Sequence, residues 1–277
     1  MRTAKLWLSQ PSLYFMLALT ALLALFPFYW MYVVGSADNS IIATIPPRVT
    51  PGNNWPVTWA HITEMFDMAT VFKNSFIVSI TVAVLQVFTS SLAGFAFAKL
   101  RFRANKPLFT AVLLFLMIPT QLGIIPLYLL MAKLGLVNTL AALILPYLVS
   151  VFGVFWMRQA MVSNVPQELI DSGAVDGAGF FRIFWSLAFP LIRSTAFVLG
   201  LFAFLTTWND FAWPLIIVQT PDNFTAQVAV SQLNSANNPD YPTIIGGSLV
   251  MAAPLMVLFV LTAKQFVSGV MDGAVKG

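Results

Sequence analysis

Six long apolar stretches, separated by polar loops, constrain this chain more than any other feature. A helix needs about 20 apolar residues to cross the hydrocarbon core of a bilayer, and each stretch reaches that length. Only the fifth stretch contains a charged residue, Asp210. The predicted spans are residues 13–34, 74–98, 108–132, 134–157, 194–218 and 243–263. Residues 1–277 are therefore predicted to form a single all-α polytopic membrane domain with six transmembrane helices.

Charge content supports this class. Only 9% of the residues are charged, against about 25% in soluble domains, so lipid must cover much of the surface. We expect the first span to be retained, because its apolar core is longer than that of a signal peptide and no small-residue cleavage pattern follows it.

Lys and Arg are distributed unevenly between the two sets of loops. If the N-terminus is inside, only Arg48, Lys73 and Lys133 lie outside. The eleven inner residues are Arg2, Lys5, Lys99, Arg101, Arg103, Lys106, Arg158, Arg182, Arg193, Lys264 and Lys276. Because loops rich in Lys and Arg stay in the cytoplasm, we expect both termini to be cytoplasmic. This bias explains the net charge of +4 without nucleic acid, since the basic residues form no patch.

The inner loop between the fourth and fifth predicted spans, residues 158–193, is too long for a simple connector and too apolar for a disordered one. Within it, "SNVPQELIDSGAVDGAG" at residues 163–179 predicts a short helix. Ser163 or Asn164 is a candidate N-cap, and Pro166 suits the first turn. This loop therefore has a structure and a role of its own.

The rest of this predicted helix combines acidic and small residues. Glu168 lies near the positive end of the helix dipole, and Gly177 and Gly179 are expected to end the helix. Ala174 and Ala178 give it a small-residue face that a partner can approach closely. The alternative is a helix lying on the membrane surface, but such helices are usually rich in Lys and Arg. We therefore favour docking into a partner protein.

The same loop resembles the cytoplasmic loop of binding-protein-dependent ABC import permeases. That family's pattern is Glu-Ala-Ala, three residues, Gly, nine residues, then Ile-x-Leu-Pro. Here Gly177 and Pro190 stand at the expected spacing, whereas Asp171, Ser172 and Gly173 replace Glu-Ala-Ala. The spacing is therefore kept although most of the pattern's residues differ.

Other segments resemble the carbohydrate-uptake subgroup, and in particular its maltose-type second permease with six spans. They are "VPQEL" before the pattern, "DGA" at 176–178, "WND" at 208–210 and the ending "GVMDGAVKG". The resemblance implies an ATP-driven importer subunit for a sugar, oligosaccharide or sugar derivative, in a bacterial or archaeal cytoplasmic membrane.

The resemblance also implies partners. Residues 164–190 would form a coupling helix that docks on one of two cytoplasmic ATP-binding subunits, which bind ATP and Mg. The docking residues would be Glu168, Asp171, Ser172, Gly173, Asp176, Gly177, Ala178 and Pro190. A second permease would complete a heterodimer, and an extracytoplasmic substrate-binding protein would contact loop 219–242. This chain has no phosphate-binding G-x-x-x-x-G-K-[ST] motif, so we expect no cofactor and no enzyme activity here.

Asp210 is the one acid within the predicted spans, and an intramembrane ionisable group is a functional candidate by default. Trp208, Asn209 and Trp213 flank it, and aromatic faces beside amides and acids suit a sugar. The alternative is an interfacial aromatic cluster with an acid that helps helices pack. Both interpretations remain open from the sequence.

Three other functions remain possible from the sequence. An ABC import permease for a non-sugar solute would share the loop pattern. An ion-coupled secondary transporter using Asp210 would predict further intramembrane acids and an internal repeat. An intramembrane enzyme would need a nucleophile and a base within the spans. The chain has no Cys, and its one His, His61, lies in what reads as a polar loop, so no metal site is expected.

Overall fold

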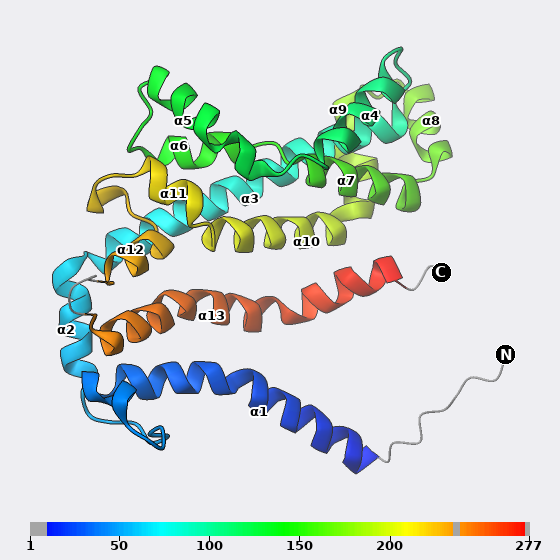
Figure 1. Cartoon of the computed structure of the whole chain (residues 1–277). Helices are drawn as coiled ribbons and strands as arrows, with labels where there is room; N and C mark the ends of the chain where they lie inside the picture. Colours follow the sequence, from blue (N-terminus) through cyan, green and yellow to red (C-terminus); the bar gives the residue numbers. More distant parts are fainter. Residues whose placement is uncertain (1–9, 235–238, 275–277) are drawn as a thin grey trace. The chain divides into compact units, whose positions relative to one another are not determined.

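The computed structural model describes residues 10–234 and 239–274, in which every regular element is helical (Figure 1). The chain divides into two compact units. Unit 1 comprises Met1–Asp67 and Val230–Pro254, and unit 2 comprises Met68–Ala229 and Leu255–Gly277. The last helix, α13 (Tyr241–Ala274), belongs to unit 1 as far as Pro254 and to unit 2 from Leu255 onward.

Unit 1 contains α1 (Gln10–Gly35), the 3-10 helix η1 (Asn39–Ala43), α2 (Trp55–Met65) and the first part of α13. Close backbone contact holds α1 to α13, because a Cβ on Gly35 would lie 3.0 Å from the Cα of Gly246. Thr58 on α2 donates a hydrogen bond to the carbonyl oxygen of Gly35 at 2.9 Å. Small residues thus let the three helices of this unit meet.

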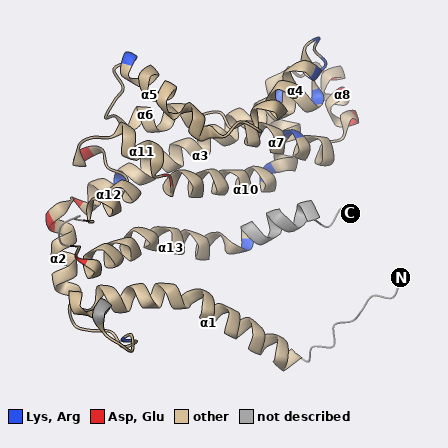
Figure 2. Ribbon diagram, viewed as in Figure 1, with Lys and Arg blue, Asp and Glu red and all other residues tan. Residues whose placement is uncertain are grey.

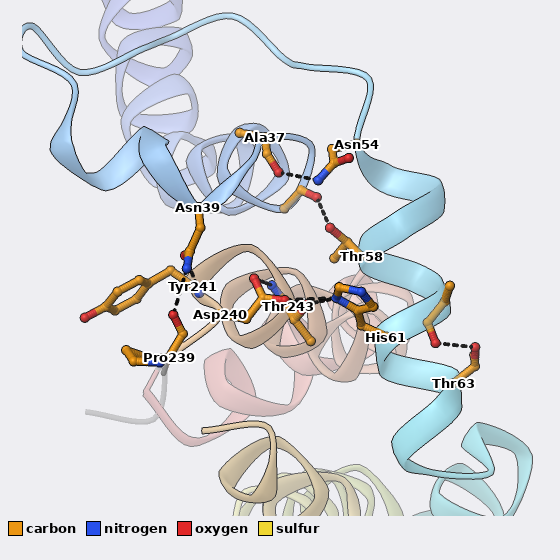
Figure 3. Close-up of polar contacts among 12 residues, drawn as sticks. Ala37, Asn39, Asn54, Thr58, His61, Thr63, Pro239, Asp240, Tyr241 and Thr243 are labelled. Carbon is orange, nitrogen blue, oxygen red and sulfur yellow. Dashed lines mark hydrogen bonds and ion pairs between the residues drawn. The ribbon is translucent and has the colours of Figure 1, made fainter. Parts of the chain in front are cut away.

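A polar cluster joins α2 to the start of α13 (Figure 3). His61 Nδ1 lies 3.0 Å from Asp240 Oδ2, and the Thr243 hydroxyl donates to the same carboxylate. Burial disfavours the charged carboxylate, but the hydrogen bonds from Thr243 and His61 outweigh it and hold the pKa of Asp240 below its ordinary value. The expectation that His61 lies in a loop is wrong. It lies inside α2, which begins with Trp55 and Pro56 in its first turn.

Unit 2 holds the remaining helices. They are α3 (Met68–Lys99), α4 (Asn105–Phe115), η2 (Thr120–Gly123), α5 (Ile124–Lys133), α6 (Leu140–Ile144), η3 (Leu145–Tyr147), α7 (Val151–Asn164), α8 (Gln167–Val175), α9 (Phe180–Ile183), the π-helical η4 (Phe184–Ala188), α10 (Phe189–Trp208), α11 (Ala212–Ile217), η5 (Pro221–Asn223) and α12 (Ala226–Gln232), whose last residues belong to unit 1.

The centre of unit 2 is the packing of α3 against α7 and α10. Glycine and serine line the contact of α3 with α7. A Cβ on Gly94 would lie 2.7 Å from the backbone nitrogen of Arg158, and Gly153 lies against Ser90. In lipid, where hydrophobic exclusion of water does not bring helices together, such small residues allow the close van der Waals contact that does.

Four helical stretches are long and apolar enough to cross a membrane: Gln10–Gly35, Met68–Lys99, Phe180–Trp208 and Tyr241–Gln265. Two further candidates are broken. Asn105–Phe115 and Thr120–Lys133 meet at 94°, and Leu140–Tyr147 and Val151–Asn164 meet at 43°. The described residues therefore hold four candidate spans, or up to six if each bent pair is one span. The structure therefore confirms an all-helical protein with four to six candidate membrane spans.

The fifth predicted span differs most in its bounds. Its helix begins at Phe180 rather than 194 and ends at Trp208 rather than 218. Proline has no N–H to donate to the preceding turn, and the wider π-helical turn η4 lies directly before Pro190. The chain therefore remains helical through this proline.

Candidate functional site

The predicted docking helix is α8, which follows α7 after a two-residue break. The expected N-cap is wrong, because Ser163 and Asn164 are the last residues of α7 and Pro166 occupies the N-cap position with an extended backbone. Lys99 at the end of α3 donates to the carbonyl oxygen of Val165 at 2.6 Å. This contact places a cation at the C-terminal end of α7 and fixes where the chain turns into α8.

The predicted end of α8 at Gly177 is confirmed. Gly177 has φ +74°, a left-handed conformation that glycine adopts without a Cβ penalty. The Gly177 N–H donates to Ala174 at 3.1 Å and the Ala178 N–H to Gly173 at 3.0 Å. Together these bonds form a Schellman motif, which satisfies the last carbonyl groups of the helix. Gly179 then serves as the N-cap position of α9.

One face of α8 packs inward. Ile170 and Gly173 are buried, and a Cβ on Gly173 would lie 2.8 Å from Leu187 Cδ1 and 3.3 Å from Ile183 Cγ1. The glycine that replaces an alanine of the family pattern therefore sits where α8 lies against α9 and η4. Ala178 is half-buried and packs against the apolar core that includes Ile170 and Ile183.

The opposite face of α8 is open to solvent and acidic. Glu168, Asp171 and Asp176 are exposed, and the Gln167 amide donates to Asp171 Oδ1 at 3.0 Å. Val175 is 87% exposed at the tip of the helix. The exposed face of α8 therefore combines three carboxylates with one apolar side chain at its tip.

The remaining residues of the predicted docking set are all exposed. Ser172 and Gly177 are exposed and Pro190 is exposed on α10, beyond the π-helical turn. Basic residues gather at the same end of unit 2 as α8, in the loop between α3 and α4 and within α7 (Figure 2). Arg158, for example, lies 4.1 Å above the ring of Phe109.

The second predicted cluster does not stay together. Trp208 is 2% exposed and packs among Phe72, Phe76 and Phe204, with ring centroids 4.8 to 6.5 Å away. Asn209 is exposed and donates to the carbonyl oxygen of Leu205 at 2.8 Å, which caps the end of α10. These two side chains serve helix packing and helix termination in this structure.

Asp210 and Trp213 instead line a cavity of about 620 Å³ in unit 2. Asp210 lies in the break between α10 and α11, and its Oδ2 accepts a hydrogen bond from the Tyr147 hydroxyl at 2.7 Å. The Trp213 indole N–H donates to the carbonyl oxygen of Ala142 at 2.9 Å, which fixes the ring in the wall. The polar side chains that line the cavity are Gln86, Thr120, Gln121, Tyr147, Ser150 and Asp210.

Sequence reasoning missed Tyr147 and Gln86 as site residues. The available signal was polarity inside an apolar stretch, since both side chains fall within predicted spans. Tyr147 is 63 positions from Asp210 in the chain, so no local pattern connects them.

The segment 219–242, which we predicted would contact a substrate-binding protein, contains helical structure. It contains α12, in which Ala226, Val228 and Ala229 are buried, and the Ala226 N–H donates to Ser75 Oγ at 2.7 Å. Residues 235–238 of this loop lie outside the described residues, as do the predicted inner residues Arg2, Lys5 and Lys276 and the last three positions of the tail.

Comparison with known proteins decides the family. The family model described as "Binding-protein-dependent transport system inner membrane component" matches residues 86–265. The chain belongs to this family. The permease's relatives include the lactose transport system permease protein LacG of Rhizobium radiobacter, 36% identical over 95% of each chain. They also include the arabinooligosaccharides transport system permease protein AraQ of Bacillus subtilis, 31% identical over 96% of this chain and 95% of AraQ.

Another relative is the sn-glycerol-3-phosphate transport system permease protein UgpE of Yersinia pestis, 28% identical over 93% of this chain and 94% of UgpE. Among solved structures, a bacterial ABC transporter involved in the import of the acidic polysaccharide alginate matches with a TM-score of 0.77. The match covers 94% of this chain and 99% of that chain at 16% identity, so it shows the fold.

These findings fix the class of the protein. It is a multi-pass component of an inner membrane and a transport permease rather than an enzyme, as its relatives are. The recognition of the family from residues 171–190 is confirmed.

Proposed function

We propose that this permease is half of the translocation pathway of an ATP-driven importer for a sugar, oligosaccharide or sugar derivative. The observation that carries the proposal is the 36% identity to a lactose permease over 95% of both chains. AraQ, named for arabinooligosaccharides, supports the same solute class. The similarity to UgpE, named for sn-glycerol-3-phosphate, keeps a phosphorylated solute as the second candidate.

The coupling site in this proposal is α8 within residues 164–190. Its exposed acidic face and the exposed Val175 are suited to a groove in a cytoplasmic ATP-binding subunit. Lys and Arg gather at this end of unit 2, which favours a cytoplasmic location for it, and both termini would then be cytoplasmic. Six spans follow if each bent pair crosses the membrane once.

The proposed assembly contains a second permease, two ATP-binding subunits and an extracytoplasmic substrate-binding protein. ATP and Mg would be bound by the ATP-binding subunits, since this chain lacks a phosphate-binding loop. Loop 219–242 would contact the substrate-binding protein through its exposed part. Gln219 and Thr220 are exposed there, whereas α12 is largely buried.

The test is purification of the tagged chain from native membranes in mild detergent, followed by mass spectrometry and measurement of ATP hydrolysis. We expect an ATP-binding subunit and a second permease to co-purify. Val175→Asp should remove the ATP-binding subunit and retain the second permease, because it adds charge only to the tip of α8. Val49→Asp is the matched control, since Val49 is 56% exposed and lies in the loop before α2.

The result that would overturn the proposal is equally concrete. If the chain purifies alone and reconstituted vesicles move lactose in response to an ion gradient without ATP, the importer assignment fails. Asp210 would then be the coupling residue of a secondary transporter.

A further inference from the structure

Three helix breaks of unit 2 meet at the 620 Å³ cavity. One lies between α4 and η2, one between η3 and α7, and one between α10 and α11. Leu116 and Ile118 line the cavity from the first break, Ser150 from the second and Asp210 from the third, and Thr120 and Gln121 line it from the start of η2. Irregular backbone at membrane depth is tolerated only where protein buries it or where it lines a water-filled cavity. The convergence of three breaks therefore indicates a polar space within the membrane domain.

Tyr147 and Asp210, joined by their hydrogen bond, also line a second, smaller hollow. The second hollow, of about 180 Å³, is lined by Gln86, Tyr147 and Asp210 together with Thr206 and Thr207 of α10. Gln86, Tyr147 and Asp210 thus line both hollows. A polar solute that moved from one hollow to the other would pass these three side chains.

The chemistry of the lining selects against negative charge. The residues that line the two cavities include one carboxylate, Asp210, and no Lys, Arg or His. An anion would meet this carboxylate in a medium that screens charge less than water does. Amide and hydroxyl groups from Gln86, Gln121 and Tyr147 can exchange hydrogen bonds with hydroxyl groups of a solute.

Size and apolar surface fit the same class of solute. The volume lies within the range of about 300–1,000 Å³ typical of small-molecule sites. Phe115 and Phe152 also line the cavity, and an aromatic side chain can cover the apolar C–H face of a sugar ring.

We infer that this subunit itself carries a solute subsite, in which Asp210, Tyr147 and Gln86 admit a neutral, hydroxyl-rich solute and disfavour anions. The inference rests on the proposed function and narrows it, because it separates sugars from solutes such as sn-glycerol-3-phosphate.

The chain's lack of cysteine makes the test direct, because any thiol introduced into it is the only one that this subunit offers. Gln121→Cys places a thiol on the cavity wall. Membranes containing the whole assembly are treated with methanethiosulfonates that carry a neutral glucose group, an anionic sulfonate or a cationic ammonium group. We expect the neutral and cationic reagents to label Cys at position 121 about fivefold or more faster than the anionic one, relative to their rates with a free thiol.

Asp210→Asn in the same background should abolish this difference, whereas Glu64→Gln should leave it unchanged. Glu64 is an exposed acid on α2 and lies outside both cavities. Val260→Cys, at a 75% exposed apolar position of α13, controls for labelling through lipid. Thr120→Cys provides a second position on the same wall if Gln121→Cys fails to assemble.

Equal relative rates for the neutral and anionic reagents, or no labelling at either position, would overturn the inference. Labelling needs neither ATP nor a known solute. Failure of an ATP-binding subunit to co-purify with the unmodified chain would refute the proposed function instead, so the two failures are distinguishable.

Discussion

Gly94 is the position where a single added methyl group has the most predictable cost. Its Cβ would lie 2.7 Å from the nitrogen of Arg158, 2.8 Å from the carbonyl carbon of Met157 and 2.9 Å from the Met157 Cβ. Two of these atoms belong to the backbone of α7, so no side-chain rotation can relieve the contact. Atoms pack best at about 3.5–4.0 Å, and Gly94→Ala must therefore move α3 and α7 apart by close to 1 Å.

The expected loss of stability follows from two opposing terms. Overpacking a tight contact costs about 1–3 kcal/mol, and a backbone clash belongs at the upper end of that range. Replacing glycine by alanine in a helix returns about 1 kcal/mol. The net loss is about 2 kcal/mol, which lowers the Tm of a chain of this size by about 4–8 °C.

The assay is thermal denaturation of the detergent-solubilised permease, followed by fluorescence-detected size-exclusion chromatography. Gly200→Ala is the matched control, because its Cβ would meet one side-chain methyl group, Val87 Cγ2, at 3.1 Å. That methyl group can shift, so we expect a Tm within about 2 °C of the parent. A Tm for Gly94→Ala equal to or above that of Gly200→Ala would refute the close α3–α7 packing.

Three further predictions concern loops and helix ends. Gly177→Val should shorten α8 and weaken recovery of the ATP-binding subunit, whereas Gly177→Asn should retain it, because Asn tolerates positive φ; co-purification measures both. Asn138→Ala should lower the free energy of unfolding by about 2 kcal/mol, because Asn138 has φ +62° and its side chain accepts hydrogen bonds from the N–H groups of Gln219 and Thr220; thermal denaturation measures this loss. Asp240→Asn should cost about 0.5 kcal/mol at neutral pH. Folding lowers the pKa of Asp240, so its contribution to stability is present above the ordinary pKa of about 4 and disappears as pH falls through the folded pKa. The stability difference between Asp240→Asn and the parent should therefore be smaller at pH 3 than at pH 7, and equal differences at the two pH values would contradict this.

The sequence predicts those parts of the fold that depend on local composition. Apolar length predicts the helices, and the end of α8 at Gly177 follows from the freedom of glycine at positive φ. The helix containing His61 was missed because an 11-residue helix with mixed polarity gives only a weak periodic signal.

The breaks inside the apolar stretches could not be predicted with the same certainty. Pro119 precedes η2 and Pro146 lies in η3, but proline is common in unbroken membrane helices too. Whether a proline bends a span depends on which groups can satisfy the freed backbone, and those groups come from distant helices.

Only part of the candidate site could be predicted from local sequence. The acidic face of α8 is local and could be identified from spacing, whereas the substrate cluster could not. Trp208 and Asp210 are separated in sequence only by Asn209, but α10 ends at Trp208, so one side chain is buried and the other lines a cavity with Tyr147.

Photo-crosslinking from the tip of α8 tests the central claim most directly. A photoreactive phenylalanine analogue replaces Val175, and irradiation is carried out in native membranes. The claim that α8 couples the permease to an ATP-binding subunit predicts a crosslink to that subunit from position 175 and none from position 49. Crosslinks from position 175 only to lipid, with position 49 behaving alike, would contradict it.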